Sequence, residues 1–171
     1  KRDDYLEAIH SRGLILSALS VHNNPLHPNP ATAKEADTVI RKAVELAKLL
    51  NVPVVNGFSG LPAGAPGDAM PNWVTCPWPP EFLEMLDYQW NQVAIPYWRE
   101  TEQFIADQGV KFAFEMHPGM LVYNVETMLR LREATGPALG CNFDPSHLFW
   151  NGVDAVAAIR KLGAAIYHLH G

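Results

Sequence analysis

The sequence Cys-Asn-Phe-Asp-Pro-Ser-His-Leu-Phe-Trp, residues 141–150, is the stretch that decides the fold. An apolar run ends here at the carboxylate of Asp144. Successive side chains of a strand point to opposite faces, so the apolar residues on either side of Asn142 would cover one face, and Asn142 and Asp144 would share the other. The stretch therefore predicts a buried strand with a carboxylate at its end.

Two further segments end in the same way: Phe-Glu-Met-His-Pro, residues 114–118, and Ile-Tyr-His-Leu-His, residues 166–170. In the first, the alternation places Glu115 and His117 on one face. In the second, it groups three residues on one face: Ile166, His168 and His170. Three strands are expected to end with a carboxylate or an imidazole on the same side.

Strand and helix patterns alternate along the whole chain. Strands are expected at residues 14–22, 51–58, 110–117, 138–144 and 164–170. Helices are expected at residues 3–12, 30–50, 80–108, 124–136 and 153–162. This alternation favours parallel strands joined by right-handed crossovers.

Two segments between these elements are unusual. The loop at residues 59–79 contains five prolines, three glycines and two tryptophans, and loops of this length in compact domains are usually functional lids or disordered. The tryptophans favour a lid. Pro96 removes a backbone hydrogen bond from the helix at residues 80–108 and predicts a break near residues 94–97.

An open doubly wound sheet and a (β/α)8 TIM barrel both satisfy the alternation. A nucleotide-binding open sheet would show a glycine-rich turn after its first strand, but the turn here is His-Asn-Asn-Pro, residues 22–25. A barrel places its active site at the carboxyl ends of its strands, where Glu115, Asp144 and His170 fall. We therefore expect an α/β chain with a TIM-barrel fold.

The number of strands indicates an incomplete barrel. Five strands fall short of the eight that a closed barrel needs, and a parallel sheet with two open edges would expose unpaired backbone. We expect residues 1–171 to be a single partial TIM-barrel domain within a longer chain. About three strand–helix units would be missing, mostly after Gly171.

Composition limits the classes of partner. The chain has 171 residues, 48% of them hydrophobic, and a net charge of −5 with 13 scattered basic residues. A nucleic-acid surface needs a basic stripe, so nucleic acid is not expected. Neither a membrane span nor a signal peptide is recognisable. Cys76 and Cys141 suit neither a disulfide framework nor a thiolate metal site, and we expect a soluble, cytoplasmic protein.

The three strand ends define a candidate metal site. Glu115, Asp144 and His170 supply two carboxylates and one imidazole, a set that suits Mn²⁺, Mg²⁺, Co²⁺ or Zn²⁺. An accessible cation of this kind polarises a carbonyl and its neighbouring hydroxyl, so that a carboxylate can remove the proton on the carbon between them. This is the chemistry of aldose–ketose isomerisation and of epimerisation through an enediolate.

Structural roles are the alternative for each residue. A glutamate at a strand end is often a surface or ion-paired residue, Asp144 before Pro-Ser can cap a turn, and His168 and His170 can be hydrogen-bonded core residues. Convergence on one barrel mouth favours the metal.

Three more histidines are candidates for contact with substrate. His147 follows Asp144 by three residues and can bind substrate, ligate a second metal or brace the ligands. His117 and His22 each lie at the end of a predicted strand. Aromatic residues can stack on the apolar face of a sugar or simply pack the loop; they are Trp73, Trp78 and Trp150.

The sequence resembles the xylose isomerase-like TIM-barrel superfamily and its sugar phosphate isomerase/epimerase group. The resemblance lies in residues 114–119, 142–147 and 167–171 and in the loop at residues 20–28. The resemblance implies a divalent ion held by Glu, Asp, His and Glu from successive strands. Glu115 matches the first ligand, Asp144 the second and His170 the third, whereas the final Glu has no counterpart in this chain.

The resemblance also implies roles in catalysis. The two glutamates of the epimerases exchange protons with substrate, so Glu115 would be both ligand and base. The histidine at the position of His147 contacts substrate in epimerases and binds metal in AP endonuclease relatives.

We therefore expect a metal-dependent sugar isomerase or epimerase of carbohydrate metabolism. The alternatives are a metal-dependent lyase or hydrolase acting on a keto-sugar or glycoside, an AP endonuclease-like phosphodiesterase, which the charge balance disfavours, and a barrel that only binds ligand. The substrate would be a small sugar or sugar derivative. The composition is also compatible with a homo-oligomer.

Overall fold

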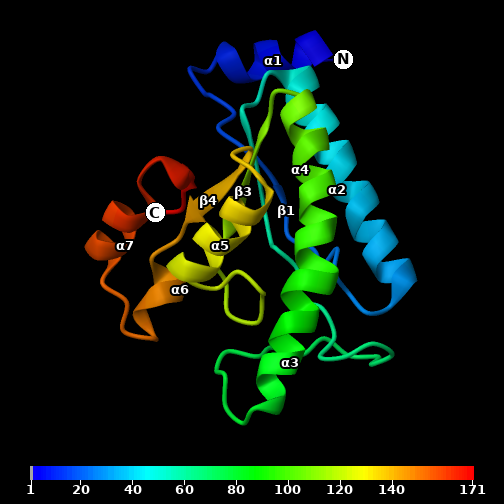
Figure 1. The fold of residues 1–171 in the computed structure, drawn as a ribbon. Helices are drawn as coiled ribbons and strands as arrows, with labels where there is room; N and C mark the ends of the chain where they lie inside the picture. Colours follow the sequence, from blue (N-terminus) through cyan, green and yellow to red (C-terminus); the bar gives the residue numbers. More distant parts are fainter. Residues whose placement is uncertain (1) are drawn as a thin grey trace.

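The computed structural model describes residues 2–171 and contains one parallel sheet (Figure 1). Its strands are β1 (Leu19–Val21), β2 (Val54–Gly57), β3 (Lys111–Glu115), β4 (Leu139–Phe143) and β5 (Ile166–Leu169). They pair in the order β1-β2-β3-β4-β5, each parallel to the next. A doubly wound sheet would reverse its strand order at a switch point, whereas this sheet always advances in one direction. The predicted fold class, a partial TIM barrel, is confirmed.

Helices connect the strands and cover one face of the sheet. The α-helices are α1 (Arg2–His10), α2 (Pro30–Leu50), α3 (Glu81–Asp87), α4 (Ile95–Asp107), α5 (Val125–Thr135), α6 (Ser146–Phe149) and α7 (Ala155–Leu162). A π-helix, η1 (Tyr88–Ala94), joins α3 to α4, and a 3-10 turn, η2 (Gly163–Ala165), precedes β5. Figure 1 shows α2 and α4 as long parallel rods beside the sheet. Among residues 2–171, no helix combines the length and the apolar character needed to cross a bilayer.

The ends of α2 follow from its sequence. The Asn29 side chain accepts a hydrogen bond from the backbone N–H of Ala31 at 2.9 Å, and proline occupies the first helical position, where its missing N–H costs nothing. Asn51 ends the helix in the left-handed conformation, at φ 55°. The buried residues recur at helical spacing: Ala36, Ile40, Val44 and Ala47.

The change predicted near Pro96 takes the form of a π-helix that ends at Ala94, directly before α4 begins, and not of a gap between two helices. Helical structure continues without interruption from α3 through η1 into α4. Proline cannot donate to the preceding turn, but the turn before it is widened, since the N–H of Ile95 donates to the carbonyl of Trp90, five residues back. A π-helical turn of this kind accommodates the proline without ending the helix.

The apolar core lies between the sheet and these helices. Trp98 of α4 is fully buried, and its ring centroid lies 4.6 Å from that of Phe114 and 5.3 Å from that of Phe112. Its indole N–H donates to the carbonyl of Ser59 at 2.9 Å. This donor has a partner, so Trp98, one of two tryptophans in the core that are fully buried, has no unsatisfied polar group.

The pairing of β4 with β5 is irregular. Cys141 is opposite Ile166, and Asn142 is opposite His168, so Tyr167 has no partner in β4. Cys141 and Asn142 are adjacent and face opposite ways, which means that Ile166 and His168 do not share a face as predicted. A β-bulge of this kind changes the direction of the residues that follow it.

Gly140 makes room for this bulge. A Cβ at position 140 would lie 2.3 Å from the ring of Tyr167. The Tyr167 hydroxyl donates to the carbonyl of Pro137 and accepts from Arg132 at 2.6 Å. The ring therefore has a fixed place over the glycine, and the bulge puts His168 beside Asn142.

Strand limits differ from the expectation at the amino end. The strand predicted for residues 14–22 is reduced to β1. Of the residues before it, Leu16 packs against the core, whereas Ile15 is 84% exposed. The short helix α6 was not predicted. It follows Asp144 directly and carries His147.

Candidate metal centre

Each of the three predicted metal ligands lies at the carboxyl end of its strand. Glu115 is the last residue of β3, Asp144 follows β4 and His170 follows β5. The backbone N–H of His170 donates to the carbonyl of Phe143 at 3.0 Å, which fixes the end of β5 against β4. One ligand-capable atom from each residue lies within 4.8 Å of the others. The structure therefore brings the three side chains together as the alternation predicts.

The Glu115 carboxylate is at the centre of the cluster and only 6% of the residue is exposed. Its Oε1 lies 2.9 Å from Nε2 of His147. Its Oε2 lies 3.0 Å from Nε2 of His22 and 3.3 Å from Nδ1 of His170. Both carboxylate oxygens thus face imidazole nitrogens, which compensate for the loss of water around a buried charge.

Asp144 has one oxygen engaged locally and one directed to the cluster. Its Oδ1 accepts from the backbone N–H of Ser146 at 2.9 Å and from the Ser146 hydroxyl at 2.6 Å. Its Oδ2 lies 3.6 Å from Nε2 of His147 and 3.7 Å from Nδ1 of His170. Asp144 therefore starts a turn, as its sequence context suggested, and also reaches the site.

The environment of Asp144 favours the carboxylate. Burial acts to raise its pKa, but the two hydrogen bonds from Ser146 and the nearby charges of His147 and His170 act more strongly, and the pKa lies below its ordinary value. Asp144 is thus ionised throughout the neutral range.

His117 and His147 form a second group around Glu115. Nδ1 of His117 donates to the carbonyl of Pro118 at 2.7 Å, so Nε2 is the nitrogen left to accept a proton or a metal. The rings of His117 and His147 lie 4.3 Å apart between centroids. Ligand-capable atoms of Glu115, His117 and His147 also lie within 4.8 Å of one another.

Phe58 separates His22 from His117. Its ring centroid lies 4.6 Å from that of His22 and 4.9 Å from that of His117. The three predicted substrate-contacting histidines therefore all lie at the cluster: His22, His117 and His147.

The residues present fit a divalent ion. Two carboxylates and several imidazoles converge within ligand reach, and within residues 2–171 the ion-pair partners of both carboxylates are histidines, with no lysine or arginine to neutralise them. Burial raises the pKa of the Cys141 thiol to about 12, so it supplies no thiolate. Oxygen and nitrogen ligands of this type suit Mn²⁺, Mg²⁺, Co²⁺ and Zn²⁺.

Sequence reasoning did not assign two asparagines to the site. Asn142 is fully buried, and its Nδ2 lies 3.4 Å from Oε2 of Glu115 and 3.1 Å from Nε2 of His170. Its Oδ1 lies 2.9 Å from Nδ1 of His168, which also contacts Asn56 at 3.1 Å. The available signal was the alternation that placed Asn142 on the face of Asp144. Burial and the charge of His170 lower the pKa of His168.

The long loop after β2 carries two of the predicted tryptophans. The ring centroid of Trp73 lies 5.5 Å from that of Tyr123 and 6.4 Å from that of Trp150, the residue after α6. Trp78 is 73% exposed. The base of the loop is held by Gln89 of η1, which donates to the carbonyls of Ala63 and Asn72 at 3.0 and 2.6 Å.

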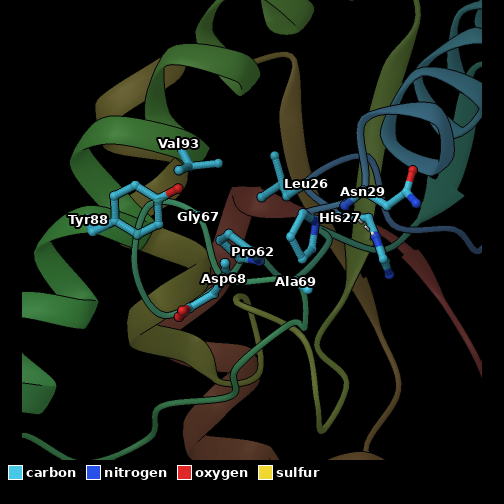
Figure 2. A pocket seen from close by; sticks show the side chains of 11 residues that line it. Leu26, His27, Asn29, Pro62, Gly67, Asp68, Ala69, Tyr88 and Val93 are labelled. Carbon is cyan, nitrogen blue, oxygen red and sulfur yellow. Dashed lines mark hydrogen bonds between the residues drawn. The ribbon is translucent and has the colours of Figure 1, made fainter.

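A cavity of about 470 Å³ lies elsewhere on the same loop (Figure 2). Its walls come from the loop after β1, the loop after β2 and η1; they include Leu26, His27, Pro62, Asp68, Tyr88 and Val93. None of the predicted site residues lines it.

Comparison with known proteins gives a family and a fold. The family model for xylose isomerase-like TIM barrels matches residues 1–171. The uncharacterized protein YfiH of Bacillus subtilis is 47% identical over 174 residues, which cover all of this chain and 55% of YfiH. The chain thus spans about half the length of this relative.

Solved structures share the fold at low identity. A D-tagatose 3-epimerase-like protein superposes with a TM-score of 0.71 at 22% identity over 99% of this chain and 60% of that one. The IolI protein with a bound zinc atom superposes with a TM-score of 0.71 at 17% identity, over 99% of this chain and 55% of that one. D-allulose 3-epimerase from Methylomonas sp. in complex with D-allulose superposes with a TM-score of 0.67 at 14% identity, over 99% of this chain and 56% of that one.

Proposed function

The chain belongs to the family of xylose isomerase-like TIM barrels, and on that premise we propose that it acts as a divalent-metal-dependent isomerase or epimerase of a small sugar. One observation carries the proposal: the buried carboxylate of Glu115 lies among imidazoles and next to a second carboxylate, Asp144, at the carboxyl ends of parallel strands. Barrel enzymes carry their active sites at this end.

We propose that Glu115, Asp144 and His170 hold the ion. Asp144 is suited to this role because its low pKa keeps it ionised, and its Oδ1 is already oriented by Ser146. A bound divalent ion supplies Lewis-acid stabilisation for the negative charge that develops on a substrate carbonyl oxygen. Zinc in the similarly folded IolI structure supports a cation in this kind of barrel.

Glu115 is the proposed base. Its carboxylate accepts the proton from the hydroxyl-bearing carbon next to the carbonyl. The electron pair of the broken C–H bond forms a C=C bond, and the π pair of the carbonyl moves to its oxygen, which gives an enediolate. Return of a proton to the former carbonyl carbon, with transfer of the hydroxyl proton to the former carbonyl oxygen, gives the isomer, and return of a proton to the opposite face of the first carbon gives the epimer.

The three histidines around Glu115 are proposed to contact the substrate. His22 and His147 each bind a different oxygen of Glu115, and His117 presents Nε2 beside His147. Substrate hydroxyls that enter this ring of nitrogens would find both donors and acceptors. The D-tagatose 3-epimerase-like and D-allulose 3-epimerase structures support a sugar as the ligand class.

The test is exchange of substrate hydrogen for deuterium. Full-length protein loaded with Mn²⁺ or Zn²⁺ is incubated in D₂O with a panel of ketoses, aldoses and 3-keto-sugars, and exchange is followed by NMR. We expect exchange with at least one sugar and a loss of about 10²–10⁴-fold in Glu115→Gln, the range expected for removal of a general base. Glu45→Gln, an exposed position on α2, is the matched control and keeps the wild-type rate.

Undiminished exchange in Glu115→Gln contradicts the role of this residue as base. Exchange accompanied by loss of a hydroxyl or an aglycone, rather than by a new isomer, identifies the lyase chemistry that shares the same first step. The absence of exchange with every sugar contradicts the proposed function.

A further inference from the structure

We propose that His168 is a positioning residue, whose hydrogen bond to Asn142 fixes the direction of the Asn142 amide and through it the orientation of Glu115 and His170. The inference deepens the proposed function and rests on it for the roles of Glu115 and His170. The contacts on which it is built do not depend on the substrate.

The three residues of this chain of contacts lie in one row across the sheet. Glu115 of β3 is opposite Asn142 of β4, and Asn142 is opposite His168 of β5. The β-bulge at Tyr167 is what puts His168, and not its neighbour, opposite Asn142. Side chains in register on adjacent strands are close enough to interact directly.

The contact of Asn142 with Glu115 shows which way the Asn142 amide points. An ionised carboxylate only accepts hydrogen bonds, so the group of Asn142 that faces Oε2 of Glu115, at 3.4 Å, is its Nδ2 donor. Nδ2 also lies 3.2 and 3.1 Å from the two ring nitrogens of His170. The Oδ1 acceptor of Asn142 therefore faces His168.

The proton of His168 is placed by this acceptor. Nδ1 of His168 lies 2.9 Å from Oδ1 of Asn142 and must donate to it. In the neutral ring, Nε2 is then the acceptor, and the hydroxyl of Ser17 at 3.3 Å can donate to it. Each group thus donates to the next: Ser17 to His168, His168 to Asn142, and Asn142 to Glu115.

Asn56 is compatible with the same tautomer when its amide is turned. Its amide contacts Nδ1 of His168 at 3.1 Å, and its Oδ1 is buried without a partner. A half-turn of this amide leaves its shape unchanged and brings Oδ1 to the N–H of His168. The Nδ1–H of His168 then faces two acceptors, the side-chain oxygens of Asn142 and Asn56, and the Asn56 nitrogen takes the buried position that the oxygen leaves.

Loss of the His168 donor would release Asn142. Its buried Oδ1 would lack a partner, and a turned amide would direct the same oxygen at the carboxylate of Glu115. Mutation of a residue that orients a metal ligand in this way typically lowers metal affinity or activity by about 10–100-fold.

The first experiment reads the tautomer directly. Full-length protein with ¹⁵N-labelled histidine, freed of metal by a chelator, is examined by NMR at neutral pH, with His168→Asn used to assign the signal. We expect Nδ1 of His168 to carry the proton. A proton on Nε2 alone, or on both nitrogens, contradicts the proposal. This result is independent of any activity on sugars.

The second experiment uses two variants of His168, each of which keeps a nitrogen near the position of only one of the two ring nitrogens. Asn at position 168 places an amide nitrogen near the position of Nδ1 and keeps the donor to Asn142, whereas Gln places its amide nitrogen near Nε2 and loses that donor. Mn²⁺ affinity is measured by calorimetry, and kcat and KM for hydrogen exchange are measured separately.

We expect His168→Gln to lower Mn²⁺ affinity or kcat by about 10–100-fold with little change in KM, and His168→Asn to restore most of the loss. Equal losses in the two variants, or no loss in His168→Gln, contradict the proposal. If the wild-type protein exchanges no sugar hydrogen, the proposed function fails, but the tautomer and the Mn²⁺ affinities still decide the role of His168.

Discussion

The two sides of β3 and β4 are buried to a similar depth but are built from opposite chemistry. Towards the helices, Phe112, Phe114 and Leu139 are fully buried against Trp98 and other apolar residues. On the other side, Glu115 and Asn142 are also buried, but each contacts polar groups. Apolar burial stabilises in proportion to area, whereas buried polar groups cost free energy unless they are paired. The helix-facing side therefore supplies stability, and the polar side holds the paired groups that the proposed function uses.

The largest effect on stability is expected on the helix-facing side. Trp98→Ala removes the side chain at the centre of the core and leaves a cavity and an unpaired carbonyl at Ser59. We expect a loss of about 3–5 kcal/mol in the free energy of unfolding, measured with urea on the full-length protein. Mn²⁺ affinity, measured under conditions where the variant is folded, should be unchanged. A comparable loss of Mn²⁺ affinity would show that the two sides are not independent.

A smaller effect is expected at the bulge that joins the two sides. Gly140→Ala places a Cβ against the ring of Tyr167, and overpacking of this kind costs about 1–3 kcal/mol. Because the clash involves one ring, the double variant with Tyr167→Ala should lose less than the sum of the single losses. Additive losses in urea unfolding would mean that the ring does not determine the role of Gly140.

The smallest effect is a dependence of stability on pH. The folded pKa of Asp144 lies below its ordinary value, so ionised Asp144 contributes stability above the ordinary carboxyl pKa, and this contribution is lost as pH falls through the folded pKa. In metal-free protein, the difference in unfolding free energy between wild type and Asp144→Asn should be constant near neutral pH and shrink in acid.

Ser146→Ala is the matched variant for this measurement, because it removes one of the hydrogen bonds that lower the pKa of Asp144. We expect it to move the acid-dependent step to higher pH. A step that stays in place would mean that the Ser146 hydroxyl has no part in the shift.

The comparison also explains what the sequence could predict. Apolar alternation is a local signal, so the order of the strands and the positions of α2 and α5 could be predicted, although β1 is shorter than the predicted strand. The sequence also predicted that three side chains would lie close together: Glu115, Asp144 and His170. This prediction used the alternation of side chains along each strand and the barrel fold, which brings the carboxyl ends of the strands together. These were the features that depend on neighbours in sequence or on the fold class alone.

The features that were missed depend on contacts between strands. Nothing near Tyr167 in the sequence shows that Gly140 makes room for its ring, so the bulge, and with it the pairing of His168 with Asn142, could not be predicted. The π-helix η1 was also not predicted, because Pro96 alone suggests a break in the helix and not a widened turn before it.

Anomalous X-ray scattering from crystals of the full-length protein grown with Mn²⁺ tests the central claim most directly. We expect one strong manganese peak within ligand distance of the carboxylates of Glu115 and Asp144 and a ring nitrogen of His170. A peak elsewhere, or none at saturating Mn²⁺ with these three side chains well ordered, would contradict the claim that the polar ends of β3, β4 and β5 form a divalent-cation site.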